Sequence, residues 1–196
     1  MNRIPHAAVL AALLSLGCTG VLSAQMSGAN KPMSHAKASM SHGSPVMDAV
    51  RSSLGRSERN IVAAAQEMPA AKYSFKPTKQ QRTFGEIVSH VANSNNFFCA
   101  KLSGMAAPTA KVPDGSASKD QLVAAVKASY AYCTKVLAGT TDAQLGSMVK
   151  YFGGRDVSRA TVAVGAAADW ADHYGQLAMY LRLNGMLPPT ARRGGM

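Results

Sequence analysis

Apolar residues recur every three or four positions in four long segments of the chain, residues 46–68, 83–102, 118–137 and 158–183. This spacing places apolar side chains on one face of an α-helix, so each segment predicts an amphipathic helix. In the first segment the apolar positions are Val46, Val50, Leu54, Ile61, Ala65 and Met68. No other segment alternates polar and apolar residues convincingly enough to predict a strand. The pattern therefore indicates an all-α protein with four helices.

Polar residues mark where three of these helices begin. Thr83 and Glu86 have the spacing of a capping box, in which each side chain accepts a hydrogen bond from the other residue's backbone N–H. Ser118 and Gln121 repeat the arrangement before the third helix. Ser158 is a suitable N-cap for the fourth helix. These signals predict the helix starts independently of the apolar spacing.

The connection between the second and third helices, residues 104–117, is rich in glycine and proline. It is long for a hairpin between antiparallel helices, but long enough to cross the length of a bundle and leave the two helices parallel. Residues 151–156 predict a further loop. We therefore expect a four-helix bundle over residues 46–189, with a long crossover between helices two and three.

The first residues have the order of a secretory signal peptide. Arg3 lies in a short polar start, residues 7–16 are apolar, and residues 17–24 supply small residues for cleavage. The apolar run is too short to span a bilayer comfortably. We therefore expect residues 1–24 to be removed and a soluble, exported protein, periplasmic or secreted, to begin near Gln25.

The segments that flank the predicted bundle lack apolar faces. Residues 25–45 are rich in serine, alanine, methionine and lysine, which predicts a disordered linker. Residues 190–196 follow two prolines and predict a disordered tail. The residues before Cys18 match a lipoprotein cleavage box poorly, so lipid attachment at Cys18 is the minor alternative to a cleaved signal peptide.

Once the signal peptide is removed, Cys99 and Cys133 are the remaining cysteines. An even number of cysteines in an exported protein favours a disulfide, because that compartment is oxidising. Two buried, unlinked thiols are an equally weighted alternative.

The formal net charge of +11 is distributed along the chain. No basic residues interleave with aromatic residues in the manner of a nucleic-acid-binding surface. We therefore expect a solvated basic surface and no nucleic-acid partner.

The fourth helix carries the residues most suited to metal chemistry. Asp169 and His173 are four positions apart, which places a carboxylate and an imidazole on one face, about 6 Å apart along the axis. These two groups can converge on one divalent metal, and the natural third ligand is His90, the other histidine of the predicted bundle. Glu86 lies one turn before His90 and could support it or act as a general base. The capping box explains Glu86 equally well.

Structural roles are the alternative for each of these residues. His90 and His173 could be buried histidines held by hydrogen bonds. Asp169 could accept a hydrogen bond from a histidine, or pair with one of three arginines. The arginines considered are Arg82, Arg159 and Arg182.

The chain resembles the DinB-like (DinB/YfiT) superfamily of metal-binding four-helix bundles. The resemblance covers residues 46–189, and its most specific stretches are residues 82–92, 172–177 and 180–185. It implies one divalent metal held by three histidines, one on the second helix and two on the fourth. It also implies zinc or nickel as the metal.

His90 and His173 match the first and last ligands of this pattern, and Asp169 stands at the middle position. The departure leaves a set of two histidines and one carboxylate, with open positions for water or substrate. An exported bacterial branch of the superfamily is similar to this chain in the regions that contain Cys99 and Cys133.

The resemblance implies two activities, thiol S-transfer and hydrolysis. Cytosolic thiol cofactors are scarce outside the membrane, so we expect a metal-dependent hydrolase that uses metal-bound water on an unidentified small-molecule substrate. The alternative is a non-catalytic bundle with a degenerate metal site, acting as a binding or stress-related envelope protein. A homodimer is left open.

Overall fold

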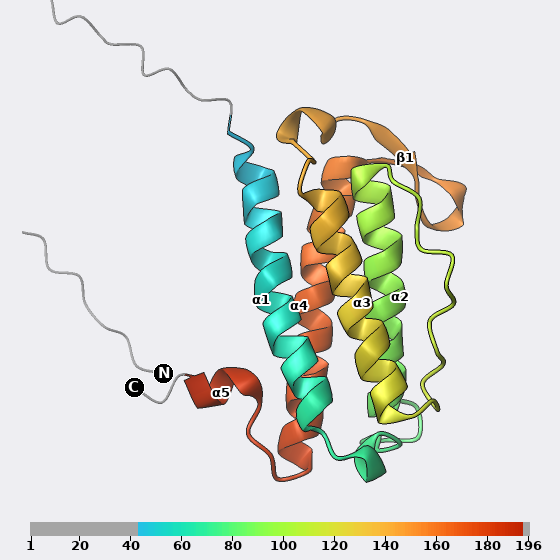
Figure 1. The fold of residues 1–196 in the computed structure, drawn as a ribbon, viewed down its shortest axis with the longest axis vertical. Helices are drawn as coiled ribbons and strands as arrows, with labels where there is room; N and C mark the ends of the chain where they lie inside the picture. Colours follow the sequence, from blue (N-terminus) through green and yellow to red (C-terminus); the bar gives the residue numbers. More distant parts are fainter. Residues whose placement is uncertain (1–42, 194–196) are drawn as a thin grey trace, which may run out of the picture. The chain divides into compact units, whose positions relative to one another are not determined.

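The computed structural model describes residues 43–193, and four long helices dominate it. They are α1 (Pro45–Glu67), α2 (Phe84–Ser103), α3 (Lys119–Leu137) and α4 (Arg159–Leu183). Figure 1 shows α1 and α4 running in one direction and α2 and α3 in the other, side by side in one bundle. The prediction of an all-α four-helix bundle is confirmed.

The long connection after α2 is the predicted crossover (Figure 1). It leaves one end of the bundle, returns along α2 and enters α3 at the other end, so that α2 and α3 are parallel. Gly104 begins it with a left-handed φ of 78°, and its N–H donates to the carbonyl of Ala100 at the end of α2. The crossover therefore runs along α2, and crossover residues such as Lys111 and Asp114 line a cleft together with His90.

One apolar core joins the four helices. Its largest fully buried side chains come from all four helices and include Met47, Ile61, Phe84, Ile87, Leu122, Tyr130, Trp170 and Leu177.

The predicted helix starts are confirmed. Thr83 and Ser118 form capping boxes with Glu86 and Gln121, and the Ser158 side chain accepts a hydrogen bond from Thr161 N. Within residues 43–193, no helix is both long and apolar enough to cross a membrane.

A small β-hairpin separates α3 from α4, and the sequence did not predict it. Strands β1 (Met148–Lys150) and β2 (Asp156–Ser158) pair antiparallel, with Val149 opposite Val157. Each strand is only three residues long, which is too short for alternation to be visible in the sequence. The loop predicted at residues 151–156 connects the two strands of this hairpin and includes the first residue of β2.

Short helical turns complete the connections. They are η1 (Ala70–Lys72), η2 (Asp142–Gln144) and η3 (Phe152–Gly154). In the turn η2, Asp142 accepts hydrogen bonds from the backbone N–H groups of Val46 and Met47 at the start of α1.

The carboxyl end differs from the predicted disordered tail. A short helix, α5 (Pro189–Arg193), follows α4 and lies beside α1. Arg192 forms a two-point contact with the Glu67 carboxylate at 2.9 and 2.6 Å and also donates to the carbonyl of Leu187. A single long-range ion pair of this kind leaves no periodic signal in the sequence. The predicted signal peptide, most of the linker and residues 194–196 lie outside the described residues.

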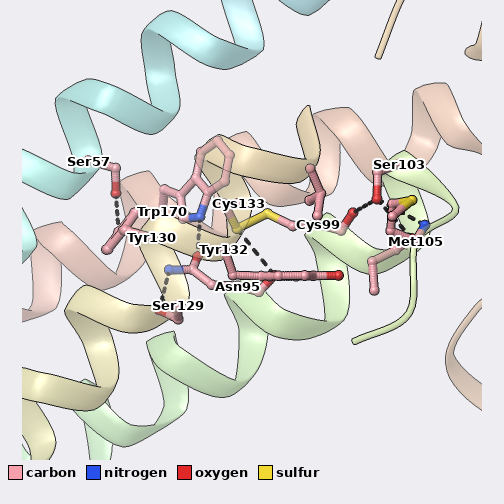
Figure 2. Close-up of a disulfide and its surroundings, with 12 residues drawn as sticks. Ser57, Asn95, Cys99, Ser103, Met105, Ser129, Tyr130, Tyr132, Cys133 and Trp170 are labelled. Carbon is pink, nitrogen blue, oxygen red and sulfur yellow. Dashed lines mark hydrogen bonds between the residues drawn. A yellow bond between two sulfur atoms is a disulfide. The ribbon is translucent and has the colours of Figure 1, made fainter. Parts of the chain in front are cut away.

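Cys99 of α2 and Cys133 of α3 form a disulfide (Figure 2). Both residues are buried, with 1% and 0% of their surface exposed. The bond joins the two parallel helices directly. Of the two alternatives that the sequence left open, the structure therefore has the disulfide and not two buried, unlinked thiols.

Candidate metal centre

His90, Asp169 and His173 come together where α2 faces α4. One potential ligand atom from each residue lies within 4.8 Å of the others. The two imidazole rings are 4.6 Å apart between centroids and nearly perpendicular, at 83°. Three donors at ~2.1 Å from a tetrahedral zinc ion are ~3.4 Å apart, so an inward movement of each ligand atom by less than ~1 Å would bring all three to bonding distance. The structure thus brings together the three residues that the sequence proposed as ligands.

Among the described residues, one carboxylate oxygen of Asp169 has a partner and the other has none. Oδ1 lies 3.2 Å from His173 Nε2. Oδ2 is buried and accepts no hydrogen bond from any described residue. A buried carboxylate oxygen without a donor is costly, and a cation is the partner that would satisfy it. The donor set and this unsatisfied oxygen both fit a divalent metal.

The histidine contact also settles the structural alternatives for Asp169. In the described part of the chain, none of the three candidate arginines forms an ion pair with its carboxylate. Asp169 therefore pairs with His173 and with none of these arginines.

The other ring nitrogen of His173 is held by two polar neighbours. Nδ1 lies 3.3 Å from Gln176 Oε1 and 3.8 Å from Asp172 Oδ2. Gln176 Nε2 in turn donates to Asp172 Oδ2 at 2.9 Å. Partners that accept from Nδ1–H leave the Nε2 lone pair for a metal and fix the ring orientation. Neither residue was predicted from the sequence to contact His173, although Gln176 is three positions after His173, a spacing that places the two side chains on one face of the helix.

His90 lies beside an open cleft. Its Nε2 is 3.4 Å from Ser94 Oγ, one turn further along α2. The cleft has a volume of about 430 Å³ and is bounded by α2 and the crossover. Its lining residues include Arg82, Glu86, Asn93 and Lys111. A small molecule can therefore reach the imidazole of His90 from the crossover side.

The two histidines have opposite pKa shifts. Burial lowers the pKa of His90, and the positive charges of Arg82 and His173 lower it further, against a smaller raising effect of Asp169. Burial also lowers the pKa of His173, but the hydrogen bond to Asp169 and the charge of that carboxylate outweigh it, so the net pKa is raised. Of the two imidazoles, His173, beside Asp169, therefore holds a proton more strongly than His90 does.

A buried hydrogen-bond network fixes α4 against α2 next to the site (Figure 2). Trp170 Nε1 donates to Asn95 Oδ1 at 2.7 Å, and Asn95 Nδ2 donates to Ser129 Oγ at 3.0 Å. Asn95 is fully buried, so its amide has to be satisfied inside the protein. Because Trp170 follows Asp169, this network sets the rotation of α4 that directs Asp169 toward His90.

Glu86 performs the capping role. Its Oε2 accepts a hydrogen bond from Thr83 N at 2.6 Å, and this bond lowers the pKa of the carboxyl group. Glu86 is outside the three-residue ligand group, although it lines the cleft at His90. Its action as a general base stays a prediction.

The fold and the site together define a four-helix bundle with two histidines and one carboxylate at the contact between α2 and α4. The model of the DinB superfamily matches residues 53–177. The chain belongs to the DinB superfamily, as the sequence resemblance had suggested. No curated protein matches the chain.

Solved structures agree with this assignment. A DinB-like protein from Bacillus subtilis is 21% identical, with a TM-score of 0.58 over 71% of this chain and 95% of its own. A DinB-like protein from Bacillus cereus is 15% identical, with a TM-score of 0.61 over 72% and 95%. A conserved protein from Enterococcus faecalis is 16% identical, with a TM-score of 0.55 over 70% and 96%. At these identities the likeness concerns the fold.

Proposed function

We propose that this protein binds one divalent metal ion through His90, Asp169 and His173 and uses it to hydrolyse a small molecule. The observation that carries the metal site is the unsatisfied, buried Oδ2 of Asp169 within a group whose donor atoms lie within 4.8 Å of one another. Two imidazoles and a carboxylate form a ligand set that zinc and nickel accept.

Hydrolysis is the reaction that such a site suits best. A divalent cation with three protein ligands keeps a coordination position open and lowers the pKa of water bound there. The chain's own contribution is to orient His173 through Gln176 and Asp172, and to admit the substrate through the cleft at His90. We also propose export, on the strength of the amino-terminal pattern, and this location disfavours thiol S-transfer.

One observation favours the non-catalytic alternative. His173 and Asp169 already form a 3.2 Å contact that stabilises both side chains without an ion. If the contact between His173 and Asp169 is purely structural and no metal binds there, the bundle is a binding protein with a degenerate metal site.

Metal analysis of the purified protein separates the two functions. We expect about one zinc or nickel ion per chain after loading, and its loss in His90→Ala. The matched control is His35→Ala, which removes an imidazole outside the proposed ligand set and should leave the stoichiometry unchanged. A wild-type protein that takes up no metal, with a thermal stability unaffected by chelator, would support the binding protein.

A further inference from the structure

The contact between α2 and α4 extends beyond the two histidines. The helices are antiparallel, so moving from His90 to Phe98 and from His173 back to Gly165 follows the same contact in the same direction. Both steps cover about 12 Å at ~1.5 Å per residue. The two ends meet, because a Cβ on Gly165 would lie 3.7 Å from Phe98 Cε1. Asp169 lies midway along this distance, one turn from Gly165.

The hairpin between β1 and β2 places a tyrosine over this end of the contact. A Cβ on Gly165 would lie only 3.2 Å from the hydroxyl of Tyr151, so the absence of a side chain at Gly165 makes room for this hydroxyl. Burial and then the nearby charge of Asp169 raise the pKa of Tyr151, in keeping with this placement. Within the described residues the hydroxyl makes no hydrogen bond. A half-buried donor therefore lies beside Gly165, and Gly165 is about one helical turn, ~6 Å along the axis of α4, from the candidate metal ligand Asp169.

Three phenylalanines hold the ring of Tyr151. Its centroid lies 5.6 Å from that of Phe97, 6.3 Å from Phe98 and 4.5 Å from Phe152. Phe152 stacks on Phe97 at 4.4 Å and 16°, yet 55% of its surface is exposed. The hairpin tip is closed by a hydrogen bond from Tyr151 N to the carbonyl of Arg155. This group, Tyr151 with Phe97, Phe98 and Phe152, is an aromatic cluster in a fixed position that offers one free hydroxyl and one exposed ring.

We infer that the aromatic cluster is the substrate-binding side of the metal site, and that the substrate is a small aromatic carboxylic acid derivative such as an aryl ester or amide. Tyr151 donates a hydrogen bond to the polar group of the substrate, and Phe152 contacts its aromatic ring. This inference rests on the proposed function, because the metal ligands hold the other end of the substrate.

Hydroxamates test the inference by binding alone, because a hydroxamate coordinates zinc and its substituent can be varied. Benzohydroxamate and acetohydroxamate are titrated by calorimetry against the zinc-loaded full chain, after zinc content has been measured for each variant. We expect wild type to bind benzohydroxamate at least about tenfold more tightly, since burial of an aromatic ring contributes on this scale. Phe152→Ala should remove most of that preference.

The hydroxyl of Tyr151 is tested with two further variants. Tyr151→Phe keeps the ring packing and should weaken both hydroxamates about fivefold to tenfold, the effect of one lost hydrogen bond. Gly165→Ala favours the helix but crowds the hydroxyl, and should weaken them in the same way. The matched control is Tyr132→Phe, whose hydroxyl donates to the carbonyl of Ala106 and which should bind as wild type does.

Each outcome decides the inference. The expected pattern of aryl preference and its loss supports it. A zinc-loaded protein that binds the two hydroxamates equally, or that is unaffected by Phe152→Ala and Tyr151→Phe, overturns the inference and leaves the proposed function intact. A protein that takes up no zinc overturns both.

Discussion

His173 Nε2 and Asp169 Oδ1 lie 3.2 Å apart on consecutive turns of α4, while the second oxygen of Asp169 has no donor in the described part of the chain. The pair therefore uses half of the carboxylate and leaves the other half facing a buried environment. His90 from α2 completes the group. This arrangement accounts for the raised pKa of His173 and for a site that a cation would complete.

The proton on His173 should depend on Asp169. Because the pKa of His173 is raised in the fold, its stabilising effect is fully present below the unfolded value of about 6.5 and is lost as the pH rises through the folded pKa. In metal-free protein, we expect Asp169→Asn to lower the pKa of His173, as followed by NMR titration of the ring protons. The loss of unfolding free energy in Asp169→Asn should be larger at pH 5 than at pH 8. An unchanged pKa of His173 would contradict the interaction.

Gln176 should contribute to metal affinity without being a ligand. Its Oε1 faces His173 Nδ1, and loss of such an orienting contact typically costs about tenfold to a hundredfold in metal affinity. We expect Gln176→Leu to weaken zinc binding by that factor, measured by competition with a chromophoric chelator. The control is Gln66→Leu at an exposed position of α1, which should bind zinc as wild type does. Equal affinity in the two variants would remove Gln176 from the site.

The disulfide should stabilise the fold without supporting the metal site. Cys99 and Cys133 are separated by 34 residues, a loop for which the loss of a crosslink costs about 2–4 kcal/mol. We expect the double variant Cys99→Ala/Cys133→Ala to lose this much unfolding free energy in urea and to keep the wild-type zinc stoichiometry. A loss of zinc in a folded double variant would show that the crosslink also positions α2.

Two substitutions at Glu86 separate its capping role from a role as base. Glutamine is also suited to this position of a capping box, so we expect Glu86→Gln to retain the stability of wild type. Glu86→Ala should cost about 1 kcal/mol, because the N–H of Thr83 loses its partner. Urea denaturation of the two variants measures the difference. Equal stability of Glu86→Ala and wild type would contradict the capping role.

The helices and the proximity of Asp169 to His173 could be predicted from the sequence because both depend on local spacing. Asp169 and His173 are one turn apart, and capping residues mark the starts of α2, α3 and α4. The partner of His90 across the bundle followed from the small number of histidines and from the family resemblance. Apart from the position of His90, these features follow from short-range patterns in the sequence.

The hairpin and its tyrosine could not be predicted in this way. The two strands are too short to show alternation, and Tyr151 meets Gly165 only through tertiary packing. The contact of Arg192 with Glu67, which anchors α5, is likewise a single long-range pair. Positions of this kind depend on how the helices are arranged, which local spacing does not encode.

The most direct test of the central claim is a crystal structure of the zinc-soaked protein with diffraction data collected at the zinc absorption edge. The account predicts one strong anomalous peak at about 2.0–2.2 Å from a ring nitrogen of His90, a ring nitrogen of His173 and an oxygen of Asp169. No peak among these three residues, or zinc bound only elsewhere on the chain, would contradict it.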